Sequence, residues 1–125
     1  MKKIAFPDIS DREWLDLLNI GEWKTIPKSN YTSSIFTDTI VILSDGHLEC
    51  SHINHESTTL SIGSLIGGIC YLTGEAVHED FSCPSDIEIL TWNIPEFSFY
   101  VQSNPQVSAG FQKLIGQEII RQRVS

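Results

Sequence analysis

The sequence predicts a mainly β domain with flanking helices, either a β-barrel or a jelly roll with helices packed at its side. Three observations support this fold class. An amphipathic helical pattern opens the chain, and two further helical patterns close it. Between them, short β-rich runs alternate with turn residues at intervals of roughly eight to twelve residues. Because 125 residues is the size of one ordinary domain, we expect a single domain over residues 1–125.

The first helical pattern covers ISDREWLDLLNIGEW. Ser10 and Glu13 have the S-x-x-E spacing of a capping box, which places the start of the helix at Ser10. Its apolar face is formed by Trp14, Leu17 and Leu18. Gly21 follows the last apolar residue and is expected to end the helix.

The β-rich region contains seven expected strands. They are WKTIP, YTSSIF, TIVILSDG, HLECSHI, STTLSIG, HEDFSC and IEILTWN. Asp45-Gly46 is typical of a two-residue turn with positive φ, so we expect TIVILSDG and HLECSHI to pair as a hairpin. NHES is expected to form the next tight turn, after which Leu60 and Ile62 should lie on one face of a strand.

Two helices are expected after the strands. Asn93 and Pro95 mark the start of PEFSFYVQS, and Asn104-Pro105 marks the start of PQVSAGFQKLIGQEIIRQRV. The apolar stripe of the second helix comprises Val107, Phe111, Leu114, Ile115 and Ile119. The expected interaction surface on this helix comprises Phe111, Ile115, Ile119 and Ile120. This surface either closes the barrel or contacts a partner.

Charge argues against several classes of partner. The net charge is −8, and no Lys or Arg occurs from Ser29 to Gln112. The molecule therefore repels polyanions, so we expect neither nucleic acid nor an anionic membrane as a partner. No apolar run has the length of a membrane span and no secretory signal is evident at the start, so we expect a cytoplasmic protein.

The sequence does not favour a metal centre or an enzyme. The metal-capable residues of one short segment are His47, Cys50, His52 and His55. Strand alternation puts Cys50 and His52 on one face and His47 on the other, so we expect no metal site and no cofactor. Three cysteines without a CxxC pair indicate buried thiols, including Cys70 and Cys83, and no nucleophile elbow is present.

The order of these segments resembles a known family. An initial helix, ILSDGHLE, LSIGSLIGG, IEILTWNIPEF and a final helix are similar to the cyclic nucleotide-binding domain over about residues 10–122. The resemblance implies a double-stranded β-helix jelly roll with one N-terminal and two C-terminal helices. Within that superfamily, LTWNIPEFSFYVQSNPQVSAGFQKLIGQEI is more similar to the Popeye domain than to a bacterial activator.

The resemblance also implies a ligand site, the phosphate-binding cassette, at GSLIGGICYLTGEAVHED. In the family this segment holds a glycine turn, a Glu for the ribose hydroxyl, a short helix and an Arg for the cyclic phosphate. Gly63, Gly67 and a short ICYL helix match. This chain has Gly68 in place of the Glu and Val77 in place of the Arg, with His78 beside it, and it has neither Popeye nucleotide motif (Asp-Ser-Pro-Glu, Phe-Gln-Val-Thr).

The charges of the chain independently argue against binding of a cyclic phosphate at this segment. Burying a phosphate charge without a partner costs several kcal/mol. The residues expected to crowd the phosphate position are Glu75, Glu79 and Asp80. Any remaining ligand contacts of the cassette would come from Gly67, Gly68, Ile69, Cys70, Val77 and His78.

We therefore expect a non-enzymatic regulatory or interaction module that has lost ordinary cAMP binding. It would act through another protein or as a dimer, with a possible uncharged or cationic small ligand. One alternative is a receptor that holds a cyclic nucleotide through the amides of Gly67 and Gly68 with His78. Another is a metal-dependent jelly-roll enzyme using His47, His52 and His55. Since the sequence ends at Ser125, we expect no helix-turn-helix and no direct transcriptional role.

Overall fold

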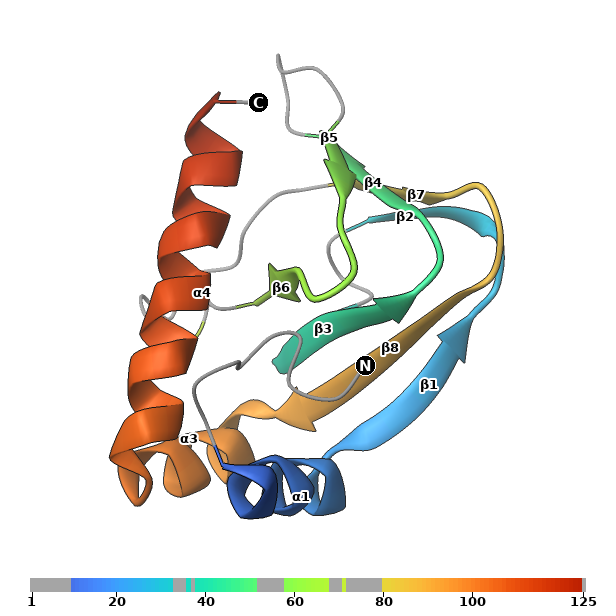
Figure 1. Cartoon of the computed structure of the whole chain (residues 1–125). Coiled ribbons are helices and arrows are strands. Elements are labelled where there is room, and N and C mark those ends of the chain that lie inside the picture. The colour runs from blue at the N-terminus through green and yellow to red at the C-terminus, as the bar shows by residue number, and fades with distance from the viewer. Residues whose placement is uncertain are drawn as a thin grey trace.

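The computed structural model describes residues 10–32, 36, 38–51, 58–67, 71 and 80–124, with backbone only from 119 onward. Among these residues, eight strands form two four-stranded antiparallel sheets (Figure 1). The first sheet has the order β1 (Glu22–Ile26), β8 (Ile87–Asn93), β3 (Thr39–Asp45), β6 (Leu65–Ile66). The second has the order β2 (Ser29–Thr32), β7 (Asp80–Cys83), β4 (Leu48–Ser51), β5 (Thr58–Leu60). This arrangement confirms the predicted jelly roll with flanking helices.

Within the described residues, three helices pack beside the first sheet. They are α1 (Asp11–Ile20), α3 (Ile94–Gln102) and α4 (Pro105–Val124). In Figure 1, α1 and α3 lie at one end of the sheets, and α4 runs upward from α3 past β6. The molecule therefore has three layers: the second sheet, the first sheet and the helices.

Strand β3, inside the first sheet, is buried on both faces. Ile40 and Ile42 of β3 belong to the core shared with the helices, whereas Val41 and Leu43 belong to the core between the two sheets. This explains why TIVIL is an uninterrupted apolar run. In the second sheet, by contrast, Leu48 and Cys50 alternate with more exposed residues, because only one face of that sheet is covered.

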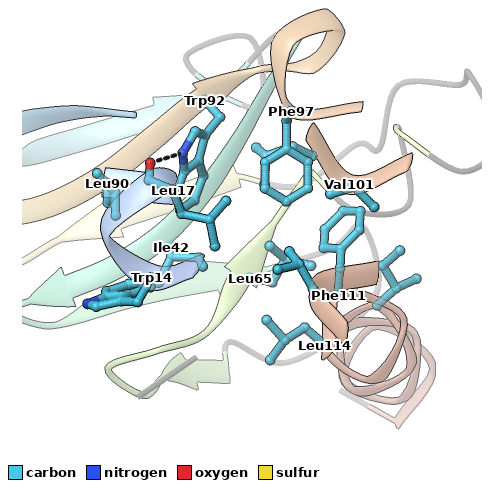
Figure 2. Close-up of a cluster of buried hydrophobic side chains, with 13 residues drawn as sticks. Trp14, Leu17, Ile42, Leu65, Leu90, Trp92, Phe97, Val101, Phe111 and Leu114 are labelled. Atoms are coloured by element: carbon cyan, nitrogen blue, oxygen red, sulfur yellow. Dashed lines mark hydrogen bonds between the residues drawn. The ribbon is translucent and has the colours of Figure 1, made fainter. Parts of the chain in front are cut away.

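Aromatic rings fill the core between the first sheet and the helices (Figure 2). The ring centroids of Trp92 and Phe97 are 5.3 Å apart, and those of Phe97 and Phe111 are 4.7 Å apart. Trp92 Nε1 donates a hydrogen bond to the carbonyl oxygen of Leu17 at 2.8 Å. A single buried side chain of β8 thus contacts both α1 and α3.

The predicted helix starts are confirmed. The Glu13 backbone N donates to Ser10 Oγ at 3.1 Å, and the Ser10 backbone N donates to Glu13 Oε1 at 3.0 Å, which completes the capping box. Asn93 caps α3, since its Oδ1 accepts from the Glu96 backbone N at 2.9 Å. α4 begins at Pro105, as Asn104-Pro105 predicts.

The predicted Asp45-Gly46 hairpin is wrong. β3 pairs with β6 and β8, whereas β4 pairs with β5 and β7, so the turn carries the chain from one sheet to the other. Both edges of β3 are already occupied, which leaves no edge for β4. The turn itself is as predicted in one respect, because Gly46 has φ +97°.

The expectation for Leu60 and Ile62 is also wrong. Leu60 is buried, but β5 ends there and Ile62 is 44% exposed. The chain bends here because the Gly63 backbone N donates to the Leu43 carbonyl at 2.8 Å. The two-residue strand β6, which follows, is too short to show a period in sequence. The NHES turn and most of YTSSIF beyond Thr32 lie outside the described residues.

No helix within the described residues is long and apolar enough to cross a membrane.

Candidate functional site

The segment that resembles a phosphate-binding cassette begins at Gly67, directly after β6. Gly67 has φ +97°, a conformation that L side chains rarely adopt, and an added Cβ would overlap the carbonyl oxygen of Thr39. Because it has no Cβ, Gly67 allows the turn after β6 to lie close to the backbone of β3.

A carboxylate lies at the backbone N–H of Gly67. The Gly67 backbone N donates to Glu118 Oε2 of α4 at 3.3 Å. Glu118 is only 3% exposed, one of two buried polar or charged residues in the described part of the chain. The start of the cassette segment therefore carries a negative group supplied by the last helix.

Tyr71 attaches the same segment to both C-terminal helices. Its backbone N donates to the Gly67 carbonyl at 3.0 Å, which is the spacing of one helical turn. Its ring packs edge-on against Phe111 of α4, with centroids 5.1 Å apart. Its hydroxyl donates to Ser98 Oγ of α3 at 3.3 Å. Together with Glu118, these contacts hold α3 and α4 against the cassette segment.

A cavity of about 210 Å³ adjoins Glu118, between β5, β6 and α4. Its polar lining includes Thr58, Ser61, Ser64, Gln117 and Glu118. Its apolar lining is formed by Leu60, Leu65 and Leu114. Among the described residues that line it, one carries a carboxylate and none is cationic.

A second cavity of about 410 Å³ lies on the outer face of the second sheet. Glu49 and Asp80 line it with neutral polar residues. The neighbours Cys50 and Phe81 face the core, so strand alternation turns these two carboxylates outward. Asp80, which is expected to crowd the phosphate position, lines this cavity, and that expectation stays a prediction.

Most of the predicted ligand contacts are not tested. Of those contacts, the structure describes Gly67 alone. The others, Gly68, Ile69, Cys70, Val77 and His78, lie outside the described residues, as do Glu75 and Glu79.

The predicted interaction helix needs one correction. Phe111 is 1% and Ile115 is 5% exposed, so both side chains contact the core and are not available to a partner in this structure. Both residues lie on the α4 face that packs on α3 and β6. The side chains of Ile119 and Ile120 are not described.

The metal-capable residues can be placed only in part. His47 is exposed and Cys50 is buried, whereas His52 and His55 lie outside the described residues. Within the described part of the chain, no three metal-capable side chains come together. Burial raises the pKa of the Cys83 thiol, which disfavours the nucleophilic thiolate.

Glu118 is the residue that the sequence interpretation missed. A usable signal was present, because Glu118 follows Leu114 by four positions and Ile115 by three. That spacing places it on the apolar face of the helix. A lone acidic residue on a buried helical face requires a partner elsewhere in the fold, and the sequence does not reveal which one.

Comparison with known proteins gives a match at the level of fold. No family model and no curated protein matches the sequence. Among solved structures, a Geobacter metallireducens protein described as cyclic nucleotide-binding has a TM-score of 0.71 at 14% identity, covering 94% of this chain and 90% of that one. The Thermus thermophilus catabolite activator protein has a TM-score of 0.74 at 15% identity, covering 96% and 60%.

A third similar structure is the regulatory domain of Toxoplasma gondii PKA with cAMP. It has a TM-score of 0.62 at 16% identity, covering 77% of this chain and 39% of that one. At these identities the likeness concerns the arrangement of the strands and helices. The chain therefore has the fold of the cyclic nucleotide-binding domains.

Proposed function

We propose that this chain is a non-enzymatic regulatory or protein-interaction module on the cyclic nucleotide-binding fold that no longer binds cAMP in the ordinary way. The observation that carries the proposal is the hydrogen bond from the Gly67 N–H to the buried carboxylate of Glu118. An N–H at the start of a glycine turn is the kind of group that holds an anion. Here a side chain of the protein accepts from it.

The carboxylate makes this position unfavourable for a phosphate. Two negative unit charges about 4 Å apart repel by about 4 kcal/mol at an effective dielectric constant of about 20. That repulsion corresponds to a loss of about a thousandfold in affinity. The stretch from Ser29 to Gln112, which includes strands β2 to β8, has no Lys or Arg to compensate. The sequence also lacks the two nucleotide-binding motifs of the Popeye domain.

The helices are held in place by the protein's own contacts. Glu118 and Tyr71 join the cassette segment to α4 through direct contacts within the chain. A module of this kind would present α4 to another protein or to a second copy of the chain. The thiols of Cys50 and Cys83 are buried and form no disulfide, which is consistent with a reducing compartment such as the cytoplasm. The net charge of −8 argues against nucleic acid as the partner.

The proposal is tested by thermal unfolding with cAMP and with cGMP, near pH 6 and near pH 8. Saturation at a hundredfold above Kd would stabilise the fold by about 2.7 kcal/mol, a shift of several degrees. We expect no shift at millimolar nucleotide. A clear shift, larger at the lower pH, would contradict the proposal and favour a receptor in which His78 contacts the phosphate.

Two variants sharpen this test. Glu118→Gln removes the charge and keeps an acceptor for Gly67, so it should acquire measurable nucleotide binding if the carboxylate is the obstacle. Glu88→Gln is the matched control, because Glu88 is exposed on β8 and remote from Gly67 in the sheet order. A gain in both variants would show that overall charge, and not Glu118, opposes binding.

The partner part of the proposal is tested separately by light scattering of the eluting protein. A dimer is expected if a second copy is the partner, and Ile119→Asp with Ile120→Asp should weaken it. A monomer that also captures no protein under matched conditions would contradict a docking role for α4.

A further inference from the structure

We propose that β1 is a self-association edge, at which two copies of the chain pair their β1 strands antiparallel and join their first sheets into one. The strand order puts β1 at one edge of this sheet, and Figure 1 shows it along the outer side of the molecule. α4 packs beside β6, at the other edge. The proposal therefore goes beyond the function proposed above and does not rest on it.

The edge formed by β1 is long, regular and exposed. Within the described residues, the other edge strands are shorter, with four residues in β2, three in β5 and two in β6, against five in β1. β1 pairs with β8 in one register from Glu22 to Ile26, and four of its five residues are exposed. Proteins usually shorten, bend or cover such an edge, because its outward N–H and C=O groups can bind another strand.

The charges on β1 complement themselves about Trp23. Glu22 and Lys24 lie on the same face of the strand, with Lys24 Nζ 4.0 Å from Glu22 Oε2, and both side chains are largely exposed. In an antiparallel pair with its two-fold axis at Trp23, Glu22 of each copy lies opposite the partner's Lys24. Opposite charges directly across two strands stabilise the pair, and the symmetry makes this contact twice.

The neighbouring registers are less favourable. Residues that lie opposite each other in a sheet share a face, so the axis falls on a residue of β1 in each register. An axis at Glu22 places two glutamates opposite each other, and an axis at Lys24 does the same with two lysines. An axis at Thr25 places the partner's Pro27, which has no N–H, opposite Trp23. Lys24 therefore opposes pairing in one register and favours it in the register centred on Trp23.

Trp23 supplies the apolar contact of the interface. It is 51% exposed and lies opposite Leu90, which belongs to the core under the helices, so its ring is on the helix side of the sheet. At the two-fold axis, the partner's Trp23 lies directly opposite it. A cavity of about 200 Å³ lined by Trp23, Lys24, Thr25 and Glu88 gives room for the second indole. Tryptophan is also among the residues that contribute most to affinity at protein interfaces.

The test is sedimentation of the whole chain over a concentration series from micromolar to millimolar. We expect a reversible dimer. Lys24→Glu places glutamates opposite each other at both contacts, and Glu22→Lys does the same with lysines, so each should raise the dimer Kd about tenfold or more. The double variant carrying both changes restores two opposite-charge contacts and should recover the wild-type Kd. The two side chains are exposed, so the fold should tolerate these changes.

The contribution of the indole is tested by Trp23→Ala, which should raise the dimer Kd about thirtyfold, as expected for a central interface residue. Phe99→Ala is the matched control, because Phe99 is 76% exposed but lies on α3. It should leave the dimer Kd unchanged. An equal effect of the two substitutions would overturn the proposal.

The remaining outcomes separate β1 from other surfaces. A chain that stays monomeric at millimolar concentration would overturn the proposal and leave β1 as an edge for a strand of another protein. A dimer that Lys24→Glu leaves intact, or that the double variant does not restore, would also overturn it. So would a dimer that only Ile119→Asp with Ile120→Asp weakens, because that contact would lie on α4. The nucleotide titration is independent of these outcomes, so the two proposals can fail separately.

Discussion

The Glu118 carboxylate lies 3.3 Å from the backbone nitrogen of Gly67, which links α4 to the turn after β6. The two residues are 51 positions apart. Because Glu118 is buried, loss of its acceptor oxygens would leave the Gly67 N–H without this partner at a part-buried position.

A substitution of Glu118 should therefore destabilise the fold more when the new side chain has no hydrogen-bond acceptor than when it keeps one. Glu118→Leu removes the acceptor, whereas Glu118→Gln retains one. We expect Glu118→Leu to be less stable than Glu118→Gln by about 1–3 kcal/mol in urea unfolding. Hydrogen exchange of the Gly67 amide should accelerate in the leucine variant alone. Equal stability and equal exchange in the two variants would show that the bond contributes nothing.

Two glycines should respond to alanine in opposite directions. Gly67→Ala places a Cβ at positive φ and against the Thr39 carbonyl, so we expect a loss of at least about 2 kcal/mol. Gly116, on α4, has nothing within 4 Å of an added Cβ. Gly116→Ala should therefore stabilise the chain by about 0.5–1 kcal/mol through higher helix propensity. Urea unfolding measures both, and a tolerated Gly67→Ala would mean that β3 and the turn after β6 can separate.

The indole of Trp92 should stabilise the fold through its hydrogen bond as well as through the volume that it fills. Trp92→Phe removes the donor to the Leu17 carbonyl and leaves a gap beside α1, so we expect a loss of about 1–3 kcal/mol. The matched control is Trp23→Phe, because Trp23 is 51% exposed and an exposed site typically changes stability by less than about 0.5 kcal/mol. Similar losses in the two variants would contradict a specific role for the Trp92 bond.

Tyr100 should make stability fall at high pH. Burial, the nearby Asp16 and Glu13 charges, and a hydrogen bond with Asp16 raise the pKa of Tyr100 to about 12, from 10.0. The folded state therefore keeps this proton where the unfolded state has lost it, so stability falls as pH rises from about 10 through about 12. Tyrosinate absorbance during a pH titration should contain a late component from Tyr100, which Tyr100→Phe should remove. An unchanged titration curve in that variant would contradict the assignment.

Local signals in the sequence were sufficient for the helices. The Ser10 and Glu13 capping box, the Asn93 cap and Asn104-Pro105 each act within one turn of backbone, so neighbouring residues specify them. The apolar runs likewise located β3 and β8. Local signals did not identify the strand partners. Leu43 and Leu48 were correctly assigned to strands, but the prediction wrongly paired these two strands with each other.

The candidate site could not be predicted in full, because it is formed by contacts between segments that are far apart in the sequence. The sequence by itself determined that the cassette segment lacks its expected Glu and Arg, because Gly68 and Val77 occupy those positions. Only the tertiary structure showed that a carboxylate from α4 reaches the start of this segment, and that the Asp45-Gly46 turn joins two sheets. The physical reason is that helix caps and strand periods arise between neighbours along the chain. Strand partners, and the partner of a buried charge such as Glu118, are instead selected by packing between segments far apart in sequence.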